Sequence, residues 1–139
     1  MYHKILLAND GSEGAFKALE TALSLARHYR AELHMISVEE LPWLLGTREE
    51  VVAEKALADQ KFEHVIAQAR EVARKQRVKL HSHLAVGHVV PTISSFIQEN
   101  GFDLLVIGFM GHSALYNRII GSATERLVRL APCTVIVVK

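Results

Sequence analysis

The chain has 139 residues, of which 50% are hydrophobic and 22% are charged, and its formal net charge is +1 at pH 7. This length and composition are typical of one folded globular domain and exclude a disordered chain. The balanced charge excludes a broad basic field of the kind that binds nucleic acid or acidic lipid, so neither is expected as a partner.

The first half of the chain begins with a strand, a helix and a second strand. His3–Ala8 is short and nearly all apolar, as a strand buried on both faces is. Ala31–Val38 predicts the second strand. Between them, apolar side chains recur at three- and four-residue steps and predict a helix with Phe16, Leu19, Leu23 and Ala26 on its inner face.

A long helix is predicted next. Thr47 and Glu50 form a capping box at its start, and no Gly or Pro interrupts the pattern before about Gln76. Its expected apolar face consists of Val51, Val52, Leu57, Phe62, Val65, Ile66 and Val72. The preceding segment LPWLLG, which contains Trp43, is open to two interpretations, a cover for the end of the core or a lid or partner patch.

The second half repeats the alternation of strands and helices. The apolar pattern predicts strands at Lys79–Val86, Asp103–Gly108 and Cys133–Val138, with helices from Val90 or Pro91 to Asn100 and over Ser122–Leu130. Five strands alternating with four helices are typical of an open parallel sheet with helices on both faces. Residues 1–139 are therefore expected to form a single α/β domain.

Cysteine usage and the N-terminal sequence indicate in which cellular compartment the protein is expected. The only cysteine, Cys133, excludes an internal disulfide and a cysteine-based zinc cluster, and at a strand start it is expected to be a small core residue and not a reactive thiol. The first apolar stretch reaches Asp10 before a signal-peptide core forms, and no apolar run approaches the ~20 residues that span a bilayer. We expect a cytoplasmic protein with no membrane partner.

Glycines mark the candidate site. Ligands of open parallel sheets bind beyond the carboxyl ends of the strands, where the turn NDGS and the segment GFMGHSALYNRIIGS are predicted. Gly108, Gly111 and Gly121 either provide turns that need positive φ angles or let backbone amides approach a phosphate at a helix start. Ser122 with Glu125 forms a capping box that satisfies this helix start without a ligand, so both interpretations stay open.

The same residues resemble a known family. The spacing G-x2-G-x9-G-[ST] is similar to the nucleotide-binding signature of the universal stress proteins, and the first strand with its turn, a glycine after the third strand and the terminal APCTVIVV extend the resemblance over the whole chain. It implies the strand order 3-2-1-4-5 of a Rossmann-like nucleotide-binding fold. It also implies a stress-response regulator that binds ATP or AMP, with or without Mg²⁺, and is not an enzyme.

The resemblance also implies a set of binding residues. The adenine and ribose would lie near Ala8, Asn9, Asp10 and Val38, with Asp10 accepting from the ribose hydroxyls. The phosphates would lie near Gly108, Gly111, His112, Gly121, Ser122, Ala123 and Thr124. Asn9 stands where many relatives have an apolar residue or proline, and Ala123 where valine is common.

Several of these residues have a second interpretation. Asp10, with Glu13, is also placed to cap the first helix, and Arg118 is more simply a solvated loop cation than a phosphate ligand. His81 and His83 project from one face of a strand, with His88 close in sequence, but no nearby carboxylate or cysteine completes a metal set. We therefore expect no metal site.

No pair of residues near the glycines makes a general base and a nucleophile, and no Walker lysine follows a glycine, so no catalytic residue is expected. The alternative to a nucleotide-binding regulator is a nucleotide-independent interaction module of the same fold. The apolar strand Thr134–Val138 would lie at a sheet edge, which predicts a homodimer paired through it.

Overall fold

The computed structural model describes residues 1–41, 46–109 and 120–139. Its elements in chain order are β1 (Lys4–Ala8), α1 (Glu13–Tyr29), β2 (Glu32–Glu39), α2 (Arg48–Lys75), β3 (Leu80–Val86), α3 (Val89–Asn100), β4 (Leu104–Gly108), α4 (Ser122–Leu130) and β5 (Thr134–Val138). Every predicted strand is present and begins one residue later than expected. The bounds predicted for α4 are confirmed.

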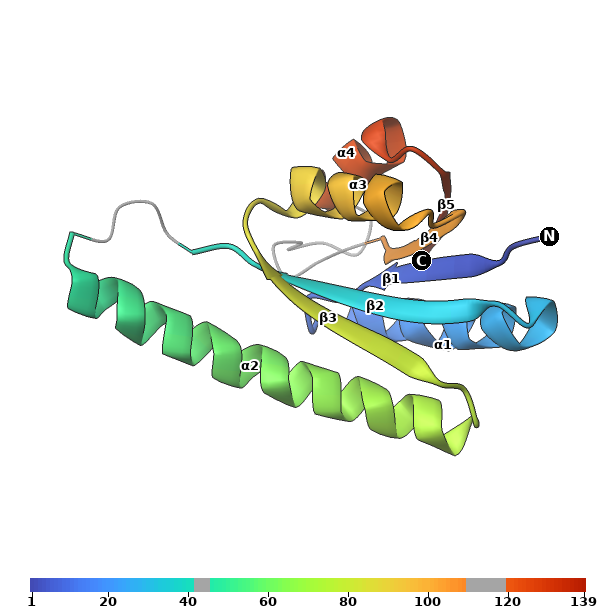
Figure 1. Ribbon diagram of the computed structural model, residues 1–139, viewed down its shortest axis with the longest axis horizontal. Helices are drawn as coiled ribbons and strands as arrows, with labels where there is room; N and C mark the ends of the chain where they lie inside the picture. The colour runs from blue at the N-terminus through green and yellow to red at the C-terminus, as the bar shows by residue number, and fades with distance from the viewer. Residues whose placement is uncertain (42–45, 110–119) are drawn as a thin grey trace.

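The five strands form one parallel sheet in the order β3-β2-β1-β4-β5, which confirms the predicted topology. Helices α1 and α2 lie on one face of this sheet, and α3 and α4 lie on the other (Figure 1). Strand β1 is central, and Ile5, Leu6 and Leu7 are fully buried because both faces of the strand are covered. No helix among the described residues is long and apolar enough to cross a membrane.

Each face of the sheet has its own apolar cluster. Side chains of β1, β2 and β4 that point toward α1 and α2 pack with Leu19 and Leu23 of α1. Side chains that point the other way pack with Ile93 and Ile97 of α3 and with Leu127 of α4. Cys133 is only partly buried against this second cluster and is not a core residue, but burial raises the pKa of its thiol, so it is protonated at neutral pH.

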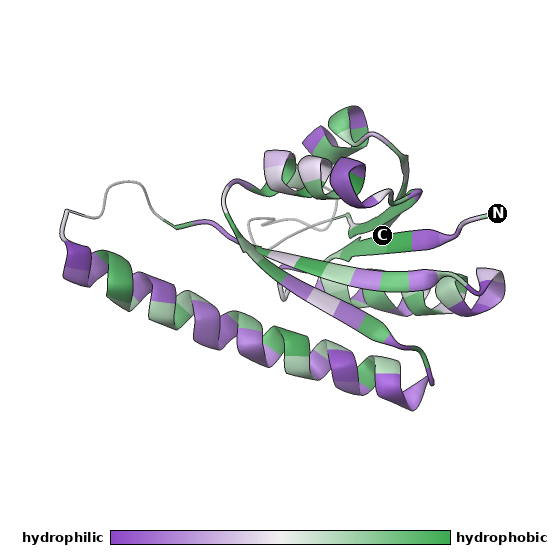
Figure 2. Cartoon of the chain, in the orientation of Figure 1, coloured by the Kyte–Doolittle hydropathy of each residue, from purple (hydrophilic) through white to green (hydrophobic). Residues whose placement is uncertain are grey.

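The predicted apolar face of α2 is wrong for the first half of the helix. Val51, Val52 and Leu57 are 41%, 62% and 62% exposed, whereas the later residues Phe62 and Val65 are buried. A helix of 28 residues is about 42 Å long, and the seven-residue strand β3 beside it spans about 23 Å. The helix therefore extends past the sheet (Figure 1), and the projecting part includes apolar residues (Figure 2).

Both ends of α2 are nevertheless fixed as the sequence predicts. Thr47 is the N-cap and its side chain accepts from the N–H of Glu50, and the helix ends before Gln76. A partly buried ion pair holds the helix to the sheet. The Nζ of Lys55 lies 3.2 Å from Oε1 of Glu39, a side chain with no exposed surface, and also binds Asp59. Burial raises the pKa of Glu39, since a charged carboxylate loses hydration there.

Asp103 ties the start of β1 to the start of β4, and its removal gives a testable effect on stability. Its carboxylate accepts hydrogen bonds from the backbone N–H groups of His3 and Lys4, at 2.8 and 3.0 Å. Partial burial raises the pKa of this carboxyl, but the backbone hydrogen bonds prevail and hold it below its ordinary value. We expect Asp103→Ala to lower the free energy of unfolding by about 2 kcal/mol at pH 7.

The pH dependence of this effect has a fixed sign. Because the pKa of Asp103 is lower in the folded than in the unfolded chain, its contribution is complete above the unfolded value of about 4 and is lost as the pH falls through the folded value. Urea denaturation at pH 7 and pH 3 measures the difference, with the exposed Glu99→Ala as control. A deficit that is the same at both pH values would contradict the role of the ionised carboxylate.

Candidate functional site

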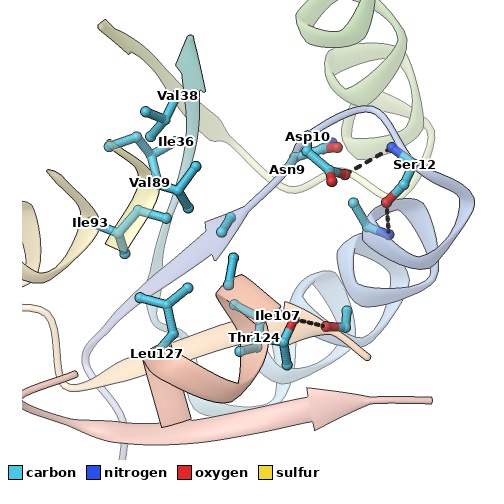
Figure 3. Close-up of a pocket in the computed structure, with 14 residues that line it drawn as sticks. Asn9, Asp10, Ser12, Ile36, Val38, Val89, Ile93, Ile107, Thr124 and Leu127 are labelled. Carbon is cyan, nitrogen blue, oxygen red and sulfur yellow. Dashed lines mark hydrogen bonds between the residues drawn. The ribbon is translucent and has the colours of Figure 1, made fainter. Parts of the chain in front are cut away.

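A cavity lies at the carboxyl ends of β1, β2 and β4, where the strand order reverses (Figure 3). The empty space between its lining residues is about 510 Å³, a volume that includes open solvent. The residues that line it are Ala8, Asn9, Asp10, Ser12, Ala15, Ile36, Val38, Val89, Ile93, Ile107, Gly108, Ala123, Thr124 and Leu127. The turn after β1 and the start of α4, the two segments predicted to form the site, therefore line one cavity.

The turn after β1 is fixed by hydrogen bonds from the backbone to three side chains. Asn9 accepts from the N–H of Gly11 at 2.8 Å, Asp10 from that of Ser12 at 2.9 Å, and Ser12 from that of Ala15 at 3.2 Å. Gly11 has a φ of 85°, which only glycine adopts without strain. Ser12, not Asp10, is the N-cap of α1, so the alternative role of Asp10 as the cap is wrong. Asp10 instead lines the cavity at its polar end.

Asn9 is an integral part of the fold. It is 2% exposed, and its side-chain NH₂ points to the sulfur of Met35, on the α1 and α2 side of the sheet. The backbone carbonyl of Asn9 accepts a hydrogen bond from the hydroxyl of Ser37 at 2.7 Å. These contacts explain why a polar residue stands at this position, because its polar groups are satisfied within the protein.

The other side of the cavity is the beginning of α4. The predicted capping box is wrong: the helix begins at Ser122, so the N-cap is Gly121, which has no side chain to accept from the first amides. The N–H of Gly121 donates to the carbonyl of Phe109 at 2.9 Å, which holds the helix start beside the end of β4. Thr124 strengthens this contact by donating its hydroxyl to the carbonyl of Gly108 at 2.8 Å.

The structural environments of Gly108 and Gly121 differ. A Cβ on Gly108 would lie 2.8 Å from backbone atoms of Gly14, so this glycine allows β4 to approach α1 closely. Gly121 has φ −64° and ψ 144°, a conformation open to any residue. Neither is among the described glycines with positive φ, so the interpretation as turn glycines is wrong for both. Gly111 lies outside the described residues.

Apolar side chains from four elements form the rest of the wall. Ile36 and Val38 project from alternate positions of β2, and Val89 and Ile93 lie one helical turn apart at the start of α3. Sequence reasoning missed Ser12, Ala15, Ile36, Val89, Ile93, Ile107 and Leu127. The signal for Ile36 was available, since it lies two residues before Val38 on the same face of a strand.

Most of the predicted site residues lie together. Ala8, Asn9, Asp10, Val38, Gly108, Ala123 and Thr124 line the cavity. Ser122 lies in an adjoining hollow that shares Val89 and Ala123 with the cavity and also contains His88, Arg126 and Glu40. Glu40 accepts from the N–H of Val89 at 2.8 Å and so caps α3. The predictions for His112 and Arg118, and for Trp43, lie outside the described residues.

Comparison with known proteins agrees with this architecture. The chain is 28% identical over 141 residues to Universal stress protein MJ0531 of Methanocaldococcus jannaschii, covering 100% of this chain and 83% of that protein. Among solved structures, universal stress protein UspA from Lactobacillus plantarum has a TM-score of 0.88 at 25% identity, with 99% and 98% of the two chains covered.

A further structure, the universal stress protein from Archaeoglobus fulgidus in complex with dAMP, has a TM-score of 0.70 at 24% identity and covers 99% of this chain and 98% of that one. The model of the universal stress protein family matches residues 1–139. The chain therefore belongs to the universal stress protein family.

Proposed function

We propose that this protein binds an adenine nucleotide, ATP or AMP, with or without Mg²⁺, in the cavity at the carboxyl ends of β1, β2 and β4. The observation that carries the proposal is the pairing of an apolar wall with the start of a helix whose N-cap is a glycine. The wall suits a flat aromatic base, and amides at a helix start suit a phosphate. The complex of the Archaeoglobus fulgidus relative with dAMP supports an adenine nucleotide.

The residues present fit the two ends of such a ligand. Ala8, Ile36 and Val38 provide apolar contact for the base, and the carboxylate of Asp10 provides an acceptor for ribose hydroxyls. The phosphates would meet the N–H groups of Ser122, Ala123 and Thr124, with Gly121 allowing close approach. Arg126 beside Ser122 adds positive charge that sequence reasoning did not assign. The proposed contacts of Gly108, Gly111 and His112 rest on the family signature.

Calorimetric titration with AMP, with ATP plus Mg²⁺, with adenosine and with GTP tests the proposal. We expect both adenine nucleotides to bind at one site per chain, adenosine to bind more weakly because it lacks the phosphates, and GTP to bind weakest. Mass spectrometry of nucleotide released from freshly purified protein identifies the ligand that the cell supplies. If no adenine nucleotide binds, the alternative of a nucleotide-independent interaction module gains weight, and the exposed apolar residues of α2 become its candidate surface.

We propose a regulatory role in the stress response and not an enzymatic one, with the cytoplasm as its expected location. Among the described residues that line the cavity, the polar side chains are Asn9, Asp10, Ser12 and Thr124, and each of the four forms a hydrogen bond with the backbone. We expect ATP turnover far below the ~10 per second of a median enzyme. A phosphate-release assay with Mg²⁺ measures it, and turnover at enzyme rates that a site mutation abolishes would contradict the proposed role.

We also propose that the protein is a homodimer paired through β5. This strand is at one edge of the sheet, and Val135, Ile136, Val137 and Val138 are only partly buried in the single chain. An apolar unpaired edge is a template for a partner strand, and a two-fold axis closes the surface on itself.

A substitution in β5 tests the dimer. We expect Ile136→Lys to shift the protein from dimer to monomer at micromolar concentration in light scattering, because lysine in an edge strand opposes its pairing with a partner strand. The exposed Lys17→Met is the control for an unrelated surface change. A wild-type monomer, or an Ile136→Lys variant that stays dimeric, would count against this interface.

A further inference from the structure

Four titratable side chains gather at the end of the sheet opposite the cavity. Glu32 and His34 lie two residues apart near the start of β2, and His81 and His83 lie two apart near the start of β3. The register pairs His34 with His81, so one face of two neighbouring strands carries all four side chains. This is the face that α3 covers, where Phe96 and Phe102 pack against the imidazoles.

The rings of the three histidines are stacked. His34 is the central one, with ring centroids 4.5 Å from His81 and 5.1 Å from His83. Its Nδ1 lies 2.8 Å from Nε2 of His83, and its Nε2 lies 2.5 Å from a carboxylate oxygen of Glu32. The side chain of His34 is 11% exposed and that of Glu32 is 50% exposed, so the cluster is buried at its centre and open to solvent at its carboxylate.

This arrangement brings metal-binding atoms together. One ligand atom each from Glu32, His34 and His81 lie within 4.8 Å of one another. Two imidazole nitrogens and one carboxylate oxygen are the donor set of an open Zn²⁺ site, in which three protein ligands leave a further position for water. The sequence-based prediction that no carboxylate lies near His81 is wrong. Glu32 is distant in sequence, but it lies on the adjacent strand β2 and is close to His81 in the folded sheet.

The positive charge of Lys4 near Glu32 already has partners of its own. Its amine is held by the carbonyl of Asn100 at 2.7 Å and lies over the ring of Phe102 at 4.7 Å from the ring centroid.

We propose that Glu32, His34 and His81 bind a divalent transition-metal ion of the Zn²⁺ class, with one ion joining β2 to the edge strand β3. Ligand atoms at about 2.0–2.2 Å from Zn²⁺ stand about 3.3 Å apart in a tetrahedral site, so the carboxylate of Glu32 moves away from His34 to admit the ion. With the metal on Nε2, neutral His34 carries its proton on Nδ1 and donates it to Nε2 of His83 over the existing 2.8 Å contact.

Titration with ZnCl₂ tests the proposal. Protein freed of metal by dialysis against EDTA, and then against chelator-free buffer, is titrated in a calorimeter. We expect one Zn²⁺ per chain, with affinity at least about tenfold lower in Glu32→Gln and in His81→Gln, because each variant removes one ligand. His64→Gln, which changes an exposed histidine of α2, should bind Zn²⁺ as the wild type does.

Two further measurements separate a site from a structural cluster. Co²⁺ bound to the wild type should give the visible absorption of a low-coordinate site, and Glu32→Gln, which changes a half-exposed side chain with little effect on the fold, should lose it. AMP affinity should be the same in these variants and the wild type, because the cavity lies at the other end of the sheet. The proposal is overturned by the absence of stoichiometric Zn²⁺ binding at micromolar concentration, or by equal Zn²⁺ affinity in the wild type, Glu32→Gln and His81→Gln.

Discussion

Gly121→Val is expected to weaken ATP and AMP binding by at least about tenfold, or roughly 1.4 kcal/mol, while the protein stays folded. The backbone of Gly121, at φ −64° and ψ 144°, is one that valine adopts readily, so the substitution introduces no backbone strain. The change from glycine to a poorer N-cap costs about 1 kcal/mol of stability or less. The added side chain instead obstructs the approach of a phosphate to the first amides of α4.

A phosphate-specific defect is the feature that distinguishes the two ends of the proposed site. Adenosine should lose much less affinity than ATP in Gly121→Val, because it lacks the group that the helix start binds. Asp10→Ala should weaken ATP and adenosine alike, since the carboxylate would serve the ribose of both. Calorimetric titration of variants with unchanged circular dichroism measures both patterns.

The control for this experiment is Gly46→Val. Gly46 precedes α2, and a Cβ added to it has no heavy atom within 4 Å, so neither fold nor ligand should respond. ATP affinity that is equal in the wild type and Gly121→Val would mean that this glycine serves no ligand. Equal losses for ATP and adenosine would mean that the substitution disturbs the whole cavity.

The fold was predictable from the sequence because each element has a strong local signal. β1 is apolar from Ile5 onward and is buried on both faces, and Thr47 is the N-cap of α2, as its capping box predicts. The projection of α2 beyond the sheet was not predictable, because Val51 and Leu57 have the same apolar pattern as the buried residues that follow. Their exposure depends on the length of the neighbouring strand, which the periodicity of a single helix does not encode.

The position of the candidate site was predictable from the sequence, whereas the roles that depend on neighbouring residues were less so. Asp10 and Val38 line the cavity as the resemblance implies. The helix caps were misassigned because Ser12 and Gly121 take positions that Asp10 and Ser122 would suit equally well by residue type. The proximity of Glu32 to His81 depends on strand register, which is a property of the folded sheet.

Gly108 belongs to the proposed nucleotide-binding signature and is also required by the fold. It ends β4, and its carbonyl accepts the hydroxyl of Thr124 at 2.8 Å, so it connects the sheet to α4. On its other side a Cβ would lie 2.8 Å from the carbonyl carbon and oxygen of Gly14 and 3.1 Å from the nitrogen of Ala15. These are backbone atoms in the first turn of α1, which cannot rotate away as a side chain does.

Gly108→Ala is therefore expected to lower the free energy of unfolding by about 2–3 kcal/mol, the cost of overpacking a rigid interior contact. Urea denaturation at 25 °C measures this loss, and Gly46→Ala, at a glycine with open space around it, should change stability far less. The stability assay and the binding assay should therefore rank the substitutions at Gly108 and Gly121 in opposite order. Gly108→Ala has the larger effect on stability, whereas Gly121→Val has the larger effect on the ratio of ATP to adenosine affinity. A Gly108→Ala protein as stable as the wild type would show that β4 and α1 separate at little cost, and that the glycine is there for the ligand alone.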